Sequence, residues 1–167
     1  CKRGLVPDMV NAAGVQLMFQ DVSATAAGGG ALRLVDGVWR IDPRLFLAMF
    51  SAKERDYSST LREILGVLWC MMSLVDPDKQ KIVFTCDNQQ TVDTINSGQT
   101  FHSFSLSLSE CIFAWCLSHN KCCWLVWLPR EHRIIKFADN HSRLRVPHDQ
   151  RSPVSVIFAA NNMTVDL

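Results

Sequence analysis

The sequence lacks any run of roughly 18 apolar residues, the length that a helix needs to cross a membrane. It also lacks the layout of a secretory signal peptide, and it contains no internal repeat and no low-complexity tract. The excess of one charge sign is small as well: 17 Lys and Arg residues against 16 Asp and Glu residues leave a net charge of +1. The net charge therefore does not indicate a nucleic-acid partner, and any surface that binds nucleic acid would have to be a local cluster of positive charge. We expect no membrane partner.

A disulfide framework is not indicated either. The seven cysteines are odd in number and lie in apolar segments such as LWCMM and FTCDN. This pattern favours thiols that act as small core residues in a reducing compartment, so we expect an intracellular protein of the cytoplasm, the nucleus or both. The segment CIFAWCLSHNKCCW raises the alternative of a zinc site. Cys111 and Cys116 are five residues apart, however, about 140° around a helix, so we interpret them as core thiols and His119 as a helix-end residue.

The chain length allows one domain with its own hydrophobic core, since 167 residues with 48% apolar composition are ordinary for a globular protein. The chain begins CKRGLVPD without a methionine, from which we expect a domain cut from a longer polypeptide. We assign residues 1–13 to an N-terminal extension, 14–146 to the domain, and 147–167 to a C-terminal tail or linker.

The pattern of apolar residues predicts a mixed α/β architecture. Strands are expected at 15–21, 31–35, 37–41, 81–87 and 122–129, and helices at 60–74, 88–98, 105–120 and 136–145. The glycine-rich segment 22–30 is expected to be a tight turn. Residues 43–57 fit a short helix or an edge strand, and residues 154–160 fit a linker strand. The order of elements indicates a mixed sheet with helices on its faces.

Two carboxylates stand at the ends of predicted strands, Asp21 and Asp87. Ligand sites of α/β sheets gather at the carboxyl ends of strands. Glu63 lies one turn into a largely buried helix, and Asp139 is expected to begin the last helix. Four acids near one point would repel each other in a poorly screened site. Divalent cations such as Mg²⁺ or Mn²⁺ would remove that conflict, and two of them about 4 Å apart could clamp both oxygens of a phosphoryl displacement.

Each acid also has a purely structural interpretation. Glu63 could complete a capping box with Thr60, and Asp87 could cap the helix that follows it. Asp21 could hold the turn before the glycines, and Asp139 could be a solvated helix residue. The spacing alone leaves both interpretations open.

Four segments occur in the order of the blocks of a ribonuclease H domain, namely QDVSATAAGGGAL, SSTLREILGVLWCM, IVFTCDNQQTVDTINSG and VWLPREHRIIKFADNHSRL. Over roughly residues 14–145 the sequence resembles the ribonuclease H domain that follows reverse transcriptase in retrotransposons of the DIRS and long-terminal-repeat types. The resemblance implies a ribonuclease H-like fold: a five-stranded mixed sheet, with three antiparallel strands plus two parallel ones, and helices on both faces.

The resemblance also implies an endonuclease that cleaves the RNA strand of RNA–DNA hybrids with two Mg²⁺ ions, for which Mn²⁺ can substitute. Asp21 would bridge both ions, Glu63 and Asp87 would hold one ion, and Asp139 would hold the other. The implied partner is the reverse transcriptase domain of the same polyprotein. An integrase-like nuclease or a 3′-exonuclease with the same fold is an alternative. The order of the acids disfavours the integrase, because its glutamate comes last among the acids rather than second.

The sequence departs from the family in two places that bear on the site. Ile135 stands where the family commonly has an asparagine, four residues before the last aspartate, and the loop from Pro129 to Asp139 is about two residues longer than usual. His132 lies where some relatives carry a mobile histidine that helps product leave, although an exposed loop histidine is the alternative. A catalytically degenerate domain that serves as a structural or nucleic-acid-binding module is therefore the rival function.

Binding of a hybrid is expected to involve mainly its backbone and its 2′-hydroxyl groups. Cations around the last block are candidates for phosphate contacts, with a solvated charged face as the alternative: Arg130, Arg133, Lys136, Arg143 and Arg145. Asn88 and Gln89 are candidates for hydrogen bonds in the minor groove.

Overall fold

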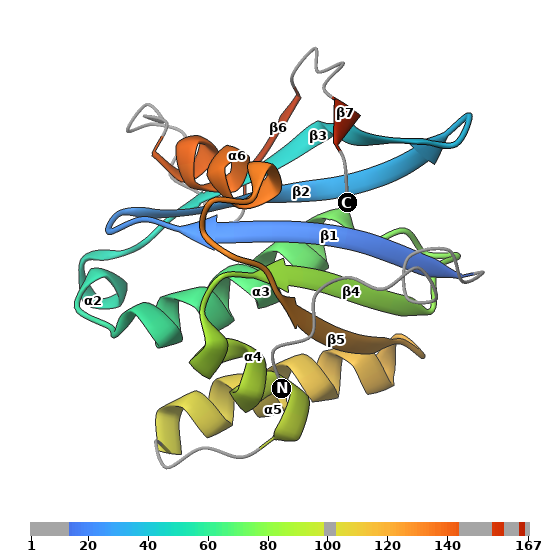
Figure 1. Ribbon diagram of the computed structural model, residues 1–167. Helices are drawn as coiled ribbons and strands as arrows, with labels where there is room; N and C mark the ends of the chain where they lie inside the picture. The colour runs from blue at the N-terminus through green and yellow to red at the C-terminus, as the bar shows by residue number, and fades with distance from the viewer. Residues whose placement is uncertain (1–13, 99–102, 144–154, 159–163, 166–167) are drawn as a thin grey trace.

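A mixed β-sheet forms the centre of the computed structural model, which describes residues 14–98, 103–143, 155–158 and 164–165 (Figure 1). The five strands of its main part lie in the order β5-β4-β1-β2-β3. The first three strands of the chain pair antiparallel, while β4 pairs parallel with both β1 and β5. Their bounds are β1 (Val15–Val22), β2 (Ala26–Val35), β3 (Val38–Met49), β4 (Lys81–Cys86) and β5 (Cys122–Trp127). The predicted five-stranded mixed sheet is confirmed.

Two short strands extend this sheet beyond β3. Both β6 (Ser155–Phe158) and β7 (Thr164–Val165) pair antiparallel with β3. The predicted linker strand at 154–160 is thus part of the main sheet. Residues 1–13, most of 147–167, and Arg145 lie outside the described residues, so the proposed domain boundaries stay a prediction.

Helices cover both faces of the sheet, as expected (Figure 1). Their bounds are α2 (Ala52–Arg55), α3 (Ser59–Leu74), α4 (Gln89–Ser97), α5 (Ser103–Ser118) and α6 (Arg133–Ser142). Alternation along β1 sends Met18 into the core under α3 and α5, and sends Leu17 and Phe19 into the core under α6. Within the described residues, no helix is long and apolar enough to span a membrane.

The glycine-rich segment is not the predicted tight turn. The turn is short, and Gly28 and Gly30 lie inside β2. A Cβ atom on Gly28 would lie 2.8 Å from the backbone nitrogen of Ser142, and one on Gly30 would lie 2.8 Å from Cζ of Phe19. Glycine is needed here for close packing rather than for a turn. Gly28 also pairs with Asp21, so the close approach brings α6 towards the end of β1.

One segment that the sequence left open is now resolved, and the predicted start of the last helix was wrong. The open segment 43–57 contains both kinds of element: residues 43–49 continue β3, which pairs on both sides rather than lying at an edge, and residues 52–55 form the short helix α2. The last helix begins at Arg133 rather than at residue 136, because the buried Ile134 and Ile135 belong to its core-facing side. His132 is its N-cap, and His132 Nδ1 accepts a hydrogen bond from the Ile134 N–H at 3.2 Å.

The helix caps decide between the two interpretations of Glu63 and Asp87. Ser58 caps α3, so the predicted capping box of Thr60 and Glu63 is wrong. Asn88 caps α4 by accepting a hydrogen bond from the Thr91 N–H at 3.1 Å. Neither Glu63 nor Asp87 is used as a cap, and both side chains remain available for a site.

The cysteines are only partly core residues. Cys70, Cys86 and Cys116 are buried as predicted, but Cys111 and Cys122 are exposed, so the core interpretation was wrong for these two. The cysteines in the described part of the chain are free thiols.

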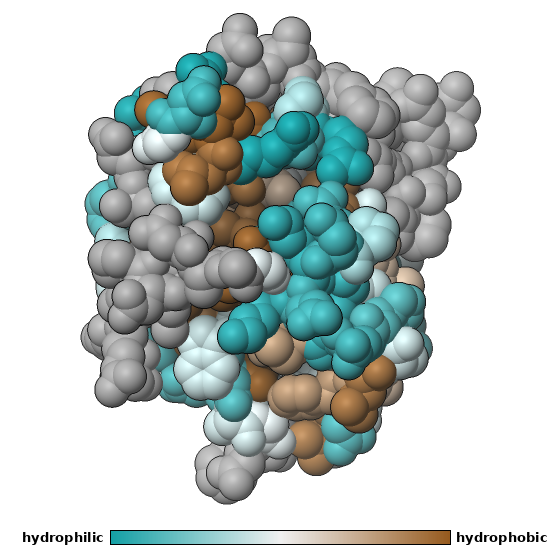
Figure 2. Space-filling model, turned by 90° about the vertical axis from the view of Figure 1, so that its right-hand side faces the viewer, coloured by the Kyte–Doolittle hydropathy of each residue, from teal (hydrophilic) through white to brown (hydrophobic). Residues whose placement is uncertain are grey.

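The molecular surface has a mixed character. Figure 2 shows hydrophilic side chains gathered in one broad region of the face that it presents, with hydrophobic side chains above and below it. Exposed large apolar side chains lie at the tip of the β2–β3 hairpin, for example Leu34, and on α5, for example Leu117.

Candidate metal centre

A pocket of about 740 Å³ lies at the edge of the sheet where the parallel strands β1 and β4 end. All four acids predicted as metal ligands line it: Asp21, Glu63, Asp87 and Asp139. Five of the predicted nucleic-acid-binding residues also line it: Asn88, Gln89, Arg130, Lys136 and Arg143. His132 and Arg133, which are both described, are not among the lining residues.

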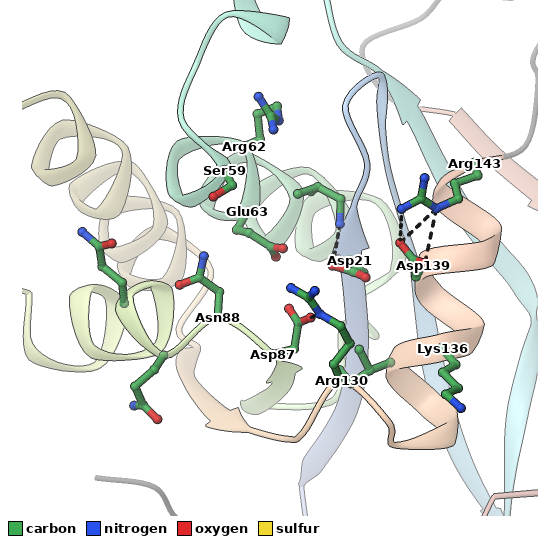
Figure 3. A pocket seen from close by; sticks show the side chains of 14 residues that line it. Asp21, Ser59, Arg62, Glu63, Asp87, Asn88, Arg130, Lys136, Asp139 and Arg143 are labelled. Carbon is green, nitrogen blue, oxygen red and sulfur yellow. Dashed lines mark hydrogen bonds and ion pairs between the residues drawn. The ribbon is translucent and has the colours of Figure 1, made fainter.

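Three of the acids point towards one another from different elements (Figure 3). Asp21 ends β1 and is 6% exposed, Glu63 projects from α3 and is 4% exposed, and Asp87 directly follows β4. Ligand atoms of Glu63, Cys86 and Asp87 all lie within 4.8 Å of one another. Segments far apart in the sequence thus bring carboxylates to one place, as a shared function requires.

The fourth acid, Asp139, lies on the α6 side of the pocket (Figure 3). It falls within α6 rather than at its start, and its side chain is 37% exposed. Arg143 Nε lies 3.2 Å from both of its carboxylate oxygens, and Arg143 Nη2 lies 3.1 Å from Oδ1. Its negative charge contributes to the raised pKa of Asp21, so the two carboxylates interact electrostatically.

The carboxyl groups perturb one another strongly. Burial, and then the negative charge of Asp87, raise the pKa of Asp21 to about 6, although hydrogen bonds from Glu63 and from the Val22 N–H oppose this in part. Burial, and then the charge of Asp21, raise the pKa of Glu63 well above its ordinary value. A nearby cation belongs to Arg130, whose Nε lies 3.4 Å from Asp87 Oδ2, but this arginine side chain is 87% exposed. Concentrated and poorly compensated negative charge is the condition that a divalent cation relieves.

The donor set fits a hard cation. Carboxylate oxygens suit Mg²⁺ and Mn²⁺, and these residues supply them from both sides of the pocket. Cys86 adds sulfur, but burial, and then the charge of Glu63, raise the pKa of its thiol well above the ordinary value. A neutral thiol is a hydrogen-bond donor, and its Sγ lies 3.9 Å from Glu63 Oε2.

The other predicted residues that line the pocket have neighbours of their own. Asn88 Nδ2 lies 3.5 Å from Thr60 Oγ1, and Gln89 Nε2 donates to Asp93 Oδ1 at 2.8 Å. Ile135, which departs from the family pattern, lines the pocket as part of the apolar core and is 1% exposed.

Sequence reasoning missed two residues next to the acids. Arg62 lines the pocket, and its guanidinium donates to the carbonyl groups of Arg55 and Tyr57. Gln20 is fully buried and donates from Nε2 to Glu63 Oε2 at 2.7 Å. Their only signal was adjacency: each directly precedes one of the predicted acids in the chain.

Among the comparisons with known proteins, only the one with solved structures found similar chains. No family model matches the sequence, and a search of curated proteins found no relative. Among solved structures, the chain is similar to RNase H1 from the halophilic archaeon Halobacterium salinarum NRC-1, with a TM-score of 0.51 and 12% identity over 76% of this chain and 93% of that one. LC9-RNase H1, a type 1 RNase H with the type 2 active-site motif, has a TM-score of 0.48 and 12% identity over 75% and 69% of the two chains. The human cytomegalovirus terminase nuclease domain has a TM-score of 0.37 and 8% identity over 80% and 66%.

At 12% identity the likeness to the archaeal enzyme concerns the fold alone. It agrees with the strand order and pairing of the five main strands and with the helices on both faces. The chain has a ribonuclease H-like fold.

Proposed function

We propose that the protein is a metal-dependent ribonuclease H that hydrolyses the RNA strand of RNA–DNA hybrids. The observation that carries the proposal is the convergence of Asp21, Glu63 and Asp87 in one pocket, with Asp139 on the opposite wall. The fold supports it, because Asp21 and Asp87 stand at the carboxyl ends of the parallel strands β1 and β4, where α/β sheets hold their ligands, and α3 and α6 bring Glu63 and Asp139 to the same pocket.

Asp21, Glu63, Asp87 and Asp139 would hold two Mg²⁺ ions, with Mn²⁺ as a substitute. Bound ions would supply an activated water and would neutralise charge on the leaving oxygen of the phosphodiester. The protein's own contribution is positional: Asp21 and Glu63 are nearly inaccessible to solvent, so their carboxylates are ordered before any substrate arrives.

Cations and amides around the pocket would bind the hybrid. Arg130, Lys136 and Arg143 have exposed side chains on the rim and can reach phosphates. Asn88 and Gln89 lie at the N-terminal end of α4, on the other wall, where they can meet 2′-hydroxyl groups in the minor groove.

The finer proposal places this activity in the reverse transcription of a retroelement, beside the reverse transcriptase domain of the same polyprotein, in the cytoplasm or the nucleus. The order of the four sequence segments supports this context. The proposed role of His132 in product release belongs with it, although the cap of α6 already engages Nδ1 of this residue.

A second function is favoured by a specific observation. Ile135 replaces the usual asparagine with an apolar core residue, while Arg130 and Arg143 pair with Asp87 and Asp139. A domain that binds nucleic acid or supports a polymerase without cleaving would tolerate these features.

Cleavage of a labelled RNA–DNA hybrid in Mg²⁺ by the wild type and by Asp87→Asn separates the two functions. We expect the wild type to cut the RNA strand, leaving a 3′-hydroxyl and a 5′-phosphate, and the variant to bind the hybrid without cutting it. If both proteins bind the hybrid and both are inert, the non-catalytic function is correct. Equal cleavage of a DNA duplex would contradict the proposed substrate.

A further inference from the structure

Strand β1 carries two buried glutamines on the face that packs against α3. Gln16 is 5% exposed and Gln20 is 0% exposed, and Met18 between them belongs to the core under α3. Burial of an amide is unfavourable unless its polar atoms find partners. The partners therefore indicate why each glutamine is present.

The two amides differ in how well they are satisfied. Gln16 Nε2 donates to the Leu74 carbonyl at 3.2 Å, and Gln16 Oε1 accepts from the Asp76 N–H at 2.8 Å, so this residue closes the end of α3. Gln20 Nε2 donates to Glu63 Oε2 at 2.7 Å, but Gln20 Oε1 has no hydrogen-bond partner among the described residues. An unpaired buried acceptor costs about 1–3 kcal/mol, so stability alone does not explain Gln20.

A second residue makes room for this amide. Gly66 lies in the middle of α3, where glycine costs about 1 kcal/mol relative to alanine. A Cβ atom at this position would lie 2.5 Å from Gln20 Oε1. Because Gly66 has no side chain, the amide of Gln20 has space next to α3, where it reaches Glu63.

Two donors converge on one oxygen of Glu63. Gln20 Nε2 and the Cys86 thiol both approach Oε2, at 2.7 and 3.9 Å. Gln20 Nε2 therefore holds one oxygen of this carboxylate from inside the core, while Glu63 itself lines the pocket.

We propose that Gln20 is a positioning residue that fixes the orientation of the Glu63 carboxylate as a ligand of the divalent cation. This inference rests on the proposed function, because it assumes a cation in the pocket. Gln20 itself does not line the pocket and acts through Glu63. Partners of this kind change metal affinity or activity by about 10–100-fold when they are removed.

The test measures binding of Mn²⁺ alone, by titration calorimetry and electron paramagnetic resonance, together with the melting temperature. Gln20→Met keeps the approximate size of the side chain and removes both amide atoms. We expect it to weaken Mn²⁺ binding by about 10–100-fold, with a melting temperature close to that of the wild type, because removal of the unpaired Oε1 offsets loss of the donor to Glu63. The matched control Gln16→Met should lower the melting temperature and leave Mn²⁺ binding unchanged, because Gln16 has no contact with the acids.

A role of Gln20 in packing alone is distinguished from a positioning role by the variant Gly66→Ala, measured both alone and combined with Gln20→Ala. The single Gly66→Ala variant displaces the amide and should weaken Mn²⁺ binding. The double variant removes the shortest contact, the one with Gln20 Oε1, so we expect its melting temperature to rise above that of Gly66→Ala while its Mn²⁺ binding stays weak. Recovery of Mn²⁺ binding in the double variant, or wild-type binding in Gln20→Met, would overturn the inference and leave the proposed function intact. If the wild type binds Mn²⁺ no better than Asp87→Asn does, the proposed function fails and this inference fails with it.

Discussion

The two walls of the pocket hold their acids in different ways. On the α3 side, Glu63 is 4% exposed and accepts hydrogen bonds from buried donors. On the α6 side, Asp139 is 37% exposed and pairs with Arg143, whose side chain is 63% exposed. The first arrangement is fixed when the core folds. The second is an exposed ion pair, which salt screens and which a phosphate can displace.

The sequence explains this asymmetry. Glu63 lies on the buried side of an apolar helix that packs on β1 and β2, so its surroundings belong to the core. The helix that carries Asp139 approaches β2 closely through Gly28, but it directs Asp139 towards the rim of the pocket. We infer that the α3 wall fixes a cation and that the α6 wall adjusts to the substrate.

The strongest test of this difference compares Glu63→Gln with Asp139→Asn in kcat/KM for hybrid cleavage. We expect Glu63→Gln to reduce it by at least about 10³-fold, near 4 kcal/mol of transition-state stabilisation, because a fixed ligand cannot be replaced from solvent. Asp139→Asn should reduce it by about 10-fold, near 1.4 kcal/mol. Losses of equal size would show that the two walls are equivalent. Melting temperatures of both variants serve as the control for folding.

The pH dependence of the free energy of unfolding should also report on the buried acids of the pocket. The pKa of Asp21 is raised to about 6, mainly by burial, so the folded protein binds a proton between pH 4 and pH 6 that the unfolded chain has lost. The free energy of unfolding of the metal-free protein should therefore fall by up to about 3 kcal/mol as pH rises through this range. Mg²⁺ at pH 7.5 should restore it.

Urea denaturation in EDTA checks this expectation, with Asp21→Asn as the comparison. The variant should show a smaller slope than the wild type, because Glu63, whose pKa is also raised, contributes a slope of the same sign in both proteins. The comparison is needed because His141, whose pKa is lowered by burial, contributes a slope of opposite sign. An identical profile for both proteins would mean that Asp21 carries no shifted charge.

A smaller effect is expected on the α6 wall itself. Arg143→Gln should reduce the slope of log K against log salt for hybrid binding by about 0.9, the contribution of one phosphate contact, while the free energy of unfolding stays close to that of the wild type. Arg40, an exposed arginine on β3 that does not line the pocket, provides the control Arg40→Gln. Equal slopes for the two variants would exclude a specific contact at Arg143.

The smallest expected effect lies at the start of α6. His132→Ala should lower the free energy of unfolding by about 1 kcal/mol through loss of the N-cap, whereas His132→Asn should retain the cap. Single-turnover cleavage should be the same for both variants and the wild type. A slower steady-state rate in both variants, with unchanged single-turnover cleavage, would instead support the predicted role in product release.

Much of the site was predictable because its acids follow local rules. Asp21 and Asp87 stand at strand ends, and the order of segments around Glu63 and Asp139 carries the resemblance to a ribonuclease H domain. The glycines of β2 were misread because the same residue type serves turns and close packing, and only their neighbours in the fold, α6 at Gly28 and Phe19 at Gly30, distinguish the two uses. Gln20 was missed for a similar reason: its partner lies 43 residues away on α3, and adjacency in the chain does not reveal that contact.

A crystal of the protein soaked in Mn²⁺ and measured at the manganese absorption edge tests the central claim most directly. We predict anomalous density for two ions in the pocket, both in contact with Asp21, one also held by Glu63 and Asp87 and the other by Asp139. Absence of anomalous density there, or density in contact with none of these carboxylates, would contradict the account.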